Sequence, residues 1–299
     1  MLLRPDCIPC ILRMTITSLR KLPLDEDSVK TLYTDILENP SLHGLDWDTT
    51  SVVVIEDIWR KIVKKVGTAD PFSLEKSNQN EKIMDLYPHL EKIVNAAADP
   101  LYMAVKLSIL GNSMDLMVAD TSVTVENSIS EKAKLPLSKE NYSQFKQQLK
   151  ASKHLLIFGD NAGEIVFDKL LIEQLPLEKV TVVVKGSPII NDATMEDAEA
   201  AGLTELVEVI DNGSDAPGTI LDDCGDAFRQ RFDEVDLVIA KGQGNYETLS
   251  DVNKDIFFIL KAKCPVIARD LGCEVGSLVL RRSSGAKPGV RKGNNYVTL

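Results

Sequence analysis

Four loops in the second half of the chain carry residues that could bind a cation and a phosphate group side by side. Each combines glycine with aspartate or asparagine, and two also contain lysine: residues 159–164, 185–192, 211–215 and 241–247. Carboxylate and amide oxygens are hard ligands that suit Mg²⁺, Mn²⁺ and similar ions. Lysine and the N-terminal amides of helices attract phosphate. A cation site beside an anion site is what the hydrolysis of a phosphate ester needs.

The acidic residues of these loops have a second interpretation. Asp160, Asp192 and Asp215 could each cap the helix that follows, because Asp and Asn are preferred at that position. The glycines could serve backbone geometry alone. The coincidence of acidic, amide and lysine residues in one set of loops favours a binding site over capping.

Familiar catalytic and nucleotide-binding motifs do not account for these loops. The sequence has no G-x-x-x-x-G-K-[ST] phosphate loop, and Gly159 and Gly163 have the wrong spacing for a dinucleotide fingerprint. Ala162, two positions after Asp160, counts against an aspartyl phosphatase of the haloacid-dehalogenase kind. The chain has 3 histidines and no His-Glu-x-x-His motif, so we do not expect histidine to be the base.

The elements that must position these loops alternate between short strands and helices from residue 153 onward. We predict strands at 154–158, 180–184, 206–210, 236–240 and 265–268, and helices at 165–174, 191–201, 219–232 and 252–263. Strands that are apolar throughout and separated by helices indicate a parallel sheet covered on both faces. The prediction is a Rossmann-like, doubly wound α/β domain with a mainly parallel sheet. Ligands bind beyond the carboxyl ends of the strands in such sheets, which is where the four loops fall.

The first half of the chain reads almost entirely as helix. Apolar residues recur at steps of three and four in 27–37, 55–66 and 83–97, which lays one apolar stripe along each helix. We interpret these stripes as core packing. The predicted organisation is an all-helical domain at 1–150, a Rossmann-like domain carrying the metal site at 151–282, and a loose tail at 283–299.

Composition and charge argue against several classes of function. With 34 Lys and Arg against 45 Asp and Glu, the formal net charge is −11, which disfavours binding to nucleic acid or to an anionic membrane. No window approaches the roughly 18–20 apolar residues of a membrane-spanning helix, and the first residues do not read as a secretory signal. Since 5 cysteines are too few for a disulfide scaffold, we expect a cytoplasmic protein.

Cys7 and Cys10 form a C-x-x-C motif at the start of a predicted amphipathic helix. A lone pair without a second C-x-x-C or a nearby histidine is weak evidence for zinc, and no strand precedes it as in a thioredoxin motif. A helix N-terminus could still activate the first thiol. Packing, metal binding, redox chemistry and a disulfide all remain open for this motif.

Three loop segments, taken together, resemble one known family. Phe-Gly-Asp-Asn-Ala-Gly-Glu at 158–164, Lys-Gly-Ser-Pro-Ile-Ile-Asn-Asp-Ala-Thr at 185–194 and Ala-Lys-Gly-Gln-Gly-Asn-Tyr-Glu at 240–247 appear in that order, each beside the end of a predicted strand. With the N-terminal C-x-x-C, they resemble the metal-dependent damage-control phosphatases, whose eukaryotic branch is also described as acidic-residue methyltransferases. The resemblance extends from residue 1 to about 282.

This resemblance implies a helical domain on a Rossmann-like domain, with a divalent metal held by Asp160, Asn161 and Asp192. The metal would be Mn²⁺, Co²⁺, Ni²⁺ or Mg²⁺, and Lys241 would bind the phosphate of the substrate. The implied activity is hydrolysis of phosphate monoesters of small metabolites, such as sugar phosphates or damaged phosphometabolites. Asp160, Asp192 and Lys241 would be the catalytic residues. Further substrate-binding candidates are Asn112, Asp115 and Asn191.

Two other functions compete with a phosphatase. A carboxyl methyltransferase needs a nucleoside pocket, usually with an acidic residue at the end of the second strand, where this sequence has Lys185 and Gly186. A non-catalytic metabolite-binding or redox module would use Cys7 and Cys10 as its switch. For a phosphatase, water is favoured over Asp160 as the nucleophile, because a carboxylate bound to metal is a poorer nucleophile.

Overall fold

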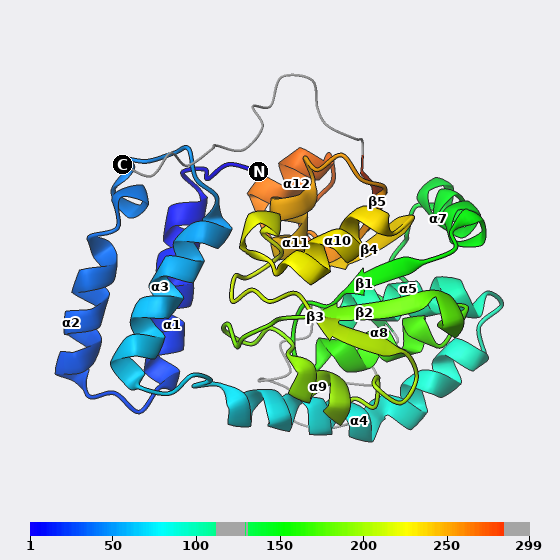
Figure 1. Cartoon of the computed structure of the whole chain (residues 1–299), viewed down its shortest axis with the longest axis horizontal. Helices are drawn as coiled ribbons and strands as arrows, with labels where there is room; N and C mark the ends of the chain where they lie inside the picture. The colour runs from blue at the N-terminus through cyan, green and yellow to red at the C-terminus, as the bar shows by residue number, and fades with distance from the viewer. Residues whose placement is uncertain (112–128, 130, 284–299) are drawn as a thin grey trace.

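A six-stranded sheet forms the centre of the structure (Figure 1). The computed structural model describes residues 1–111, 129 and 131–283, and every strand of the sheet in these residues lies between 155 and 282. The strands are β1 (Leu155–Phe158), β2 (Val180–Val184), β3 (Glu208–Asp211), β4 (Leu237–Lys241), β5 (Ile256–Lys261) and β6 (Leu278–Arg282).

The strand order is β3-β2-β1-β4-β5-β6. The first five strands are parallel, and β6 runs antiparallel to β5. All residues of β1, β2 and β4 are buried, as expected for apolar strands covered by helices on both faces. The predicted Rossmann-like, doubly wound α/β fold is confirmed. The chain order of the strands reverses between β1 and β4, and open α/β sheets bind ligands at such a switch point.

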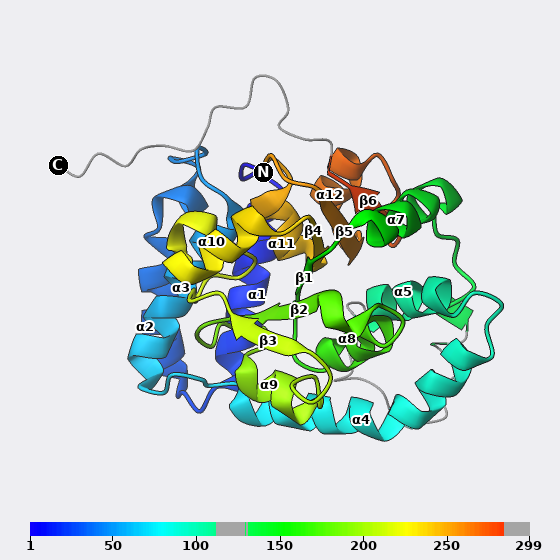
Figure 2. The ribbon, with the colours of Figure 1, turned by 45° about the vertical axis from the view of Figure 1, so that its right-hand side comes forward.

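Helices cover both faces of the sheet, and a group of N-terminal helices stands beside it (Figures 1 and 2). They are α1 (Cys7–Lys21), α2 (Glu26–Leu37), α3 (Ser51–Val66), α4 (Ser73–Asn95), α5 (Pro100–Gly111), α7 (Lys139–Ala151), α8 (Glu164–Ile172), α9 (Met195–Ala200), α10 (Asp226–Glu234), α11 (Gly242–Leu249) and α12 (Pro265–Leu271). Short 3-10 helices lie at Pro40–His43, Leu177–Lys179 and Leu221–Asp223. Within the described ranges, none of the helices is long and apolar enough to cross a membrane.

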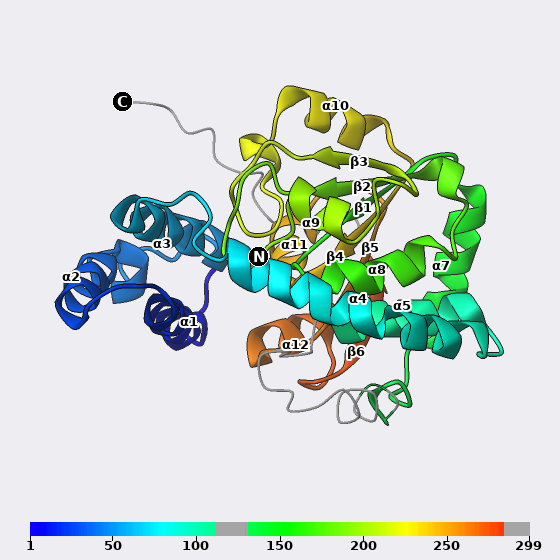
Figure 3. The same cartoon turned by 90° about the horizontal axis from the view of Figure 1, so that it is seen from below.

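Three clusters of buried apolar side chains hold these elements together. The first lies between one face of the sheet and α4, α5, α7, α8 and α9. The second lies between the other face and α10, α11 and α12. The third joins α1, α2 and α3, and α4 extends from this group across the first core (Figure 3).

The first core crosses the domain boundary predicted at residue 150. Helices α4 and α5 precede residue 150 but share the first core with the sheet. That residues 1–150 form a separate domain stays a prediction. Of the tail predicted at 283–299, all but Ser283 lies outside the described residues.

Two elements near the C-terminal end differ in type from their prediction. The sequence predicts a helix at 252–263 and a strand at 265–268, whereas the structure has β5 at Ile256–Lys261 and α12 at Pro265–Leu271. The apolar run of β5 is buried inside the sheet, and a short apolar run has no period that separates strand from helix. Pro265 is the first residue of α12, where its fixed φ and missing N–H are favourable.

Two predicted helices begin later than the sequence indicates. Helix α9 starts at Met195 instead of residue 191, because Thr194 is its N-cap and forms a capping box with Asp197. Helix α10 starts at Asp226 instead of residue 219, after a 3-10 turn. Residues 191–194 consequently belong to the loop that carries Asp192, which places this side chain at the carboxyl edge of the sheet.

Candidate active site

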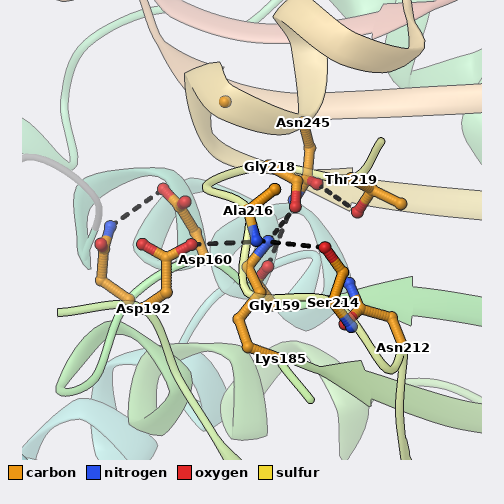
Figure 4. A network of polar contacts seen from close by, with 12 residues as sticks. Gly159, Asp160, Lys185, Asp192, Asn212, Ser214, Ala216, Gly218, Thr219 and Asn245 are labelled. Carbon is orange, nitrogen blue, oxygen red and sulfur yellow. Dashed lines mark hydrogen bonds and ion pairs between the residues drawn. The ribbon is translucent and has the colours of Figure 1, made fainter. Parts of the chain in front are cut away.

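The loops that follow β1 and β2 are joined by backbone hydrogen bonds. Ala162 N donates to Asn191 O at 2.9 Å, and Ala193 N donates to Asp160 O at 2.9 Å. Asn161 and Asp192 form an isolated antiparallel bridge between these bonds. The structure thus brings together Asp160, Asn161 and Asp192, the three residues predicted to hold a metal. Figure 4 shows the side chains of Asp160 and Asp192 next to each other.

Capping does not explain the two aspartates. The N-cap of α8 is Gly163 and that of α9 is Thr194, so neither Asp160 nor Asp192 caps the helix that follows it. Asp215 lies in the loop after β3, and both its carboxylate oxygens accept hydrogen bonds from Arg60, at 2.8 and 3.1 Å. The second interpretation of Asp160 and Asp192 is therefore wrong.

Asp160 lies at the switch point between β1 and β4. Its Oδ2 accepts a hydrogen bond of 2.9 Å from the Asn161 amide, which also donates to Glu164 Oε2 at 3.3 Å. Gly242, the first residue of α11, is packed so closely against this carboxylate that a Cβ there would lie 1.9 Å from Asp160 Oδ2. Burial, and then the negative charges of Glu164 and Asp192, raise the pKa of Asp160.

The ammonium group of Lys241 is buried and surrounded by hydrogen-bond acceptors. Its Nζ is 2.7 Å from Glu164 Oε1, 2.5 Å from Asp168 Oδ1 and 3.2 Å from Ser108 O, and the side chain is 0% exposed. Burial lowers the pKa of Lys241, but the carboxylates of Asp168 and Glu164 more than offset this and raise it above its ordinary value. The ammonium group therefore stays charged.

One carboxylate oxygen of Asp192 accepts no hydrogen bond from the residues that the structure describes. Its Oδ2 is buried and accepts no hydrogen bond within the described part of the chain, although Lys185 Nζ forms an ion pair with it at 3.5 Å. Lys185 donates instead to the carbonyl of Gly218 (Figure 4). Burial raises the pKa of Asp192, and Lys185 partly counteracts it.

The residues present fit a divalent cation. Among the described residues, the carboxylates of Asp160, Glu164, Asp168 and Asp192 lie close together, where Lys185 pairs with Asp192 and Lys241 pairs with Glu164 and Asp168. Asp192 Oδ2 has the ion pair with Lys185 but accepts no hydrogen bond from the described residues, and a bound cation would give this buried oxygen a further partner. In residues 1–111, 129 and 131–283, no group of three or more His, Cys, Asp or Glu side chains has a metal-holding arrangement. A cation would therefore depend on two carboxylates and the Asn161 amide oxygen.

Substrate binding was also predicted for Asn112, Asp115, Asn191 and Lys241. Asn112 and Asp115 lie outside the described residues. The backbone carbonyl of Asn191 accepts the hydrogen bond from Ala162, and its proposed role in substrate binding stays a prediction. Lys241 Nζ is enclosed by Glu164, Asp168 and Ser108. Its predicted contact with the substrate phosphate stays a prediction.

Several residues of the site were not among the predicted ones. Glu164 and Asp168 are spaced by four on α8, which places both carboxylates on one face toward Lys241, and this spacing was a usable signal. Asn245 donates to Lys241 O at 2.7 Å and to Gly159 O at 3.2 Å, which fixes the end of β1 to the start of α11. Lys185 stood in a loop already singled out, but its partner Asp192 could not be known from the sequence.

Comparisons with known proteins show the family of this chain. The family model described as "Damage-control phosphatase ARMT1-like domain" matches residues 3–279. The chain is 35% identical over 292 residues to a damage-control phosphatase of Archaeoglobus fulgidus, covering 94% of this chain and 99% of the relative. It is 36% identical over 233 residues to damage-control phosphatase PH1575 of Pyrococcus horikoshii, covering 76% and 79%. A crystal structure of PH1575, described as a DUF89 family protein, matches with a TM-score of 0.84 at 30% identity, covering 95% of this chain and 100% of that one.

The chain therefore belongs to the damage-control phosphatase ARMT1-like domain family. The family predicted from the three loop segments is confirmed, and so is the phosphatase class of enzyme that it implied.

Proposed function

We propose that the chain hydrolyses phosphate monoesters of small metabolites, such as sugar phosphates or damaged phosphometabolites, with a divalent cation held by Asp160, Asn161 and Asp192. Mn²⁺, Co²⁺, Ni²⁺ and Mg²⁺ are the candidate ions. The observation that carries the proposal is the buried Asp192 Oδ2, which accepts no hydrogen bond from the described residues and lies beside the carboxylate of Asp160. The names of the relatives support phosphatase chemistry.

The sheet supplies the rigidity that such a site needs. When bound, the cation would lower the pKa of a water molecule and neutralise phosphoryl oxygens. Asp160 and Asp192 follow neighbouring parallel strands, so their backbones have little freedom to move apart. Lys185 and Lys241 remain outside the ligand set and hold the surrounding carboxylates in place.

The start of α11, beside the switch point, suits a phosphate group. Helix α11 begins directly after β4, so its first N–H groups lie at the switch point. Lys263, in the loop after β5, is exposed and near enough to Asp160 to lower the pKa of that carboxyl. Its backbone N–H donates to Gln243 Oε1 at 2.6 Å, which fixes it to the first turn of α11. We expect the substrate phosphate to bind between Asp160 and these groups.

Asp160→Asn and Asp192→Asn test this proposal, because each keeps the side-chain shape and removes one anionic ligand. We expect hydrolysis of p-nitrophenyl phosphate and of a sugar-phosphate panel to fall at least ~10²-fold. The rise in Tm on adding Mn²⁺ should disappear in both variants. Chelation should abolish the activity of the unaltered chain.

Asp215→Asn is the matched control, since Asp215 follows β3 at the same edge of the sheet but pairs with Arg60. It should keep the activity and the response to Mn²⁺. If both site variants also kept a normal Mn²⁺ response, the proposed site would be refuted.

A further inference from the structure

Helix α4 contacts the loops of the site through the buried amide of Asn80. The side chain is 3% exposed and lies outside the proposed ligand set. Its Oδ1 accepts a hydrogen bond from Gly163 N at 2.6 Å, and its Nδ2 donates to Asp197 Oδ1 at 2.8 Å. The two ends of this amide therefore contact two different segments of the α/β fold.

The oxygen end holds the loop after β1. Gly163 lies two residues after Asn161 and is the N-cap of α8, with φ +72° and no side-chain cap of its own. The first N–H groups of a helix need external acceptors, and Asn80 supplies one from a distant helix. A Cβ at Gly163 would lie 3.2 Å from Gln79 Cβ, so α4 packs directly against this turn.

The nitrogen end holds the loop after β2. Asp197 Oδ2 accepts from Thr194 N at 2.9 Å and from Thr194 Oγ1 at 3.0 Å, and Thr194 lies two residues after Asp192. Lys76, one turn before Asn80 on α4, balances the charge of Asp197 at 3.2 Å and also pairs with Asp70 at 2.7 Å. Lys76, Asn80, Thr194 and Asp197 are all buried, so each of these polar groups needs its partners.

We infer that Asn80 is a positioning residue whose amide sets the spacing between the loops of Asn161 and Asp192, and through it the affinity for the cation. The inference rests on the proposed function. Its physical basis is that the amide has one acceptor end and one donor end, and each has a fixed partner. A side chain with two acceptors or none cannot hold both loops at once.

Asn80→Asp tests the inference, because it keeps the size and the acceptor toward Gly163 but sets a carboxylate against Asp197. We expect Mn²⁺ affinity, measured by calorimetric titration, to fall at least about tenfold. In chelator-treated protein, hydrogen exchange at the amides of Gly163 and Thr194 should become faster, on the order of tenfold. The double variant Asn80→Asp/Asp197→Asn exchanges donor and acceptor between the two positions and should restore both readouts.

Asn78→Asp is the matched control, since this amide is exposed on the same helix and should change neither readout. Normal affinity and exchange in Asn80→Asp, or a double variant that restores neither, would overturn the inference. If the unaltered chain failed to bind Mn²⁺, the proposed function would be refuted instead, and exchange in the chelator-treated variants would still decide whether Asn80 holds the two loops.

Discussion

At the scale of single residues, the missing side chain of Gly242 lets the junction of β4 and α11 lie close to Asp160. Its φ is +79°, and a Cβ would lie 1.9 Å from Asp160 Oδ2 and 2.2 Å from Cγ. In Gly242→Ala the carboxylate must therefore move. Because misplacement by about 1 Å can cost on the order of 10²-fold in rate, we expect kcat/KM to fall by about that factor. Steady-state kinetics and the Mn²⁺-dependent rise in Tm would measure the change.

Gly272→Ala separates this steric effect from backbone strain. Gly272 ends α12 with φ +66° and has nothing within 4 Å of a Cβ, so it shares the left-handed conformation without the close contact. We expect this variant to lose about 1–2 kcal/mol of stability and to keep its kcat/KM. Equal kinetic losses in the two variants would show that the contact with Asp160 does not matter.

A site residue could be predicted from the sequence when its position depends on a nearby strand, and could not when it depends on a partner far along the chain. Asp160 and Asn161 closely follow the apolar strand β1, and Asp192 lies in the loop after the neighbouring strand β2, so the rule for parallel sheets brings all three to one edge. Asn80 is separated from Asp197 by 117 positions and from Gly163 by 83. A pairing of that kind depends on how α4 packs against the sheet, and no local pattern encodes it.

At the scale of elements, the strands with the strongest local signal were the easiest to predict. The Val-Thr-Val-Val-Val run of β2 was predicted with its observed bounds, since β-branched residues favour a buried strand. The secondary-structure types predicted for β5 and α12 were wrong. The apolar run of β5 becomes a strand because it pairs with the neighbouring strands β4 and β6. Strand β6 was not predicted at all. It is an antiparallel edge strand whose identity depends on its pairing with β5.

Helix α1 begins at the C-x-x-C motif, and the structure favours a packing role for it. Cys7 packs against the third core, Cys10 is exposed, and both are free thiols. Burial raises the pKa of each, and the nearby Cys264 raises it further. A raised pKa disfavours the thiolate that redox chemistry and metal binding require.

The variant Cys7→Ser/Cys10→Ser should therefore lose stability but keep its Mn²⁺-dependent turnover per folded molecule. We expect a lower Tm, caused mainly by the polar hydroxyl at the half-buried Cys7. The single variant Cys10→Ser is the control and should have nearly the same Tm as the unaltered chain. A double variant that is fully folded but inactive would assign the motif to function.

At the scale of the whole molecule, the α1–α3 group contributes to the site although it has its own core. Ile189, in the loop between Lys185 and Asp192, is 1% exposed and belongs to that third core. Around it, polar contacts join the group to the α/β fold. Arg60 on α3 pairs with Asp215, and Ser51 donates to Glu247 on α11. The loop that carries Asp192 is thus packed between two cores, and separating them would release it.

The raised pKa of Glu56 predicts that this junction between the two parts is sensitive to pH. Glu56 lies on α3 at 5% exposure, and burial raises its pKa to about 7, with Arg60 opposing the shift and Asp223 and Asp215 adding to it. A folded-state pKa above the ordinary value means that folded protein binds more protons than unfolded protein between about pH 4.5 and 7. The stability contributed by protonated Glu56 is present below this window and is lost as pH rises through it.

Glu56→Gln should remove this pH dependence, because glutamine resembles the protonated acid at every pH. At pH 5 the variant and the unaltered chain should have similar Tm values. At pH 8 the variant should be more stable by about 1–2 kcal/mol, since one pKa unit corresponds to about 1.4 kcal/mol and the exposed Arg60 screens part of the effect. Asp57→Asn, at an exposed position of the same helix, is the control and should leave Tm nearly unchanged at both pH values. Thermal melts from pH 4.5 to 8.5 measure the difference, and parallel curves for Glu56→Gln and the unaltered chain would show that Glu56 is not the group that responds to pH.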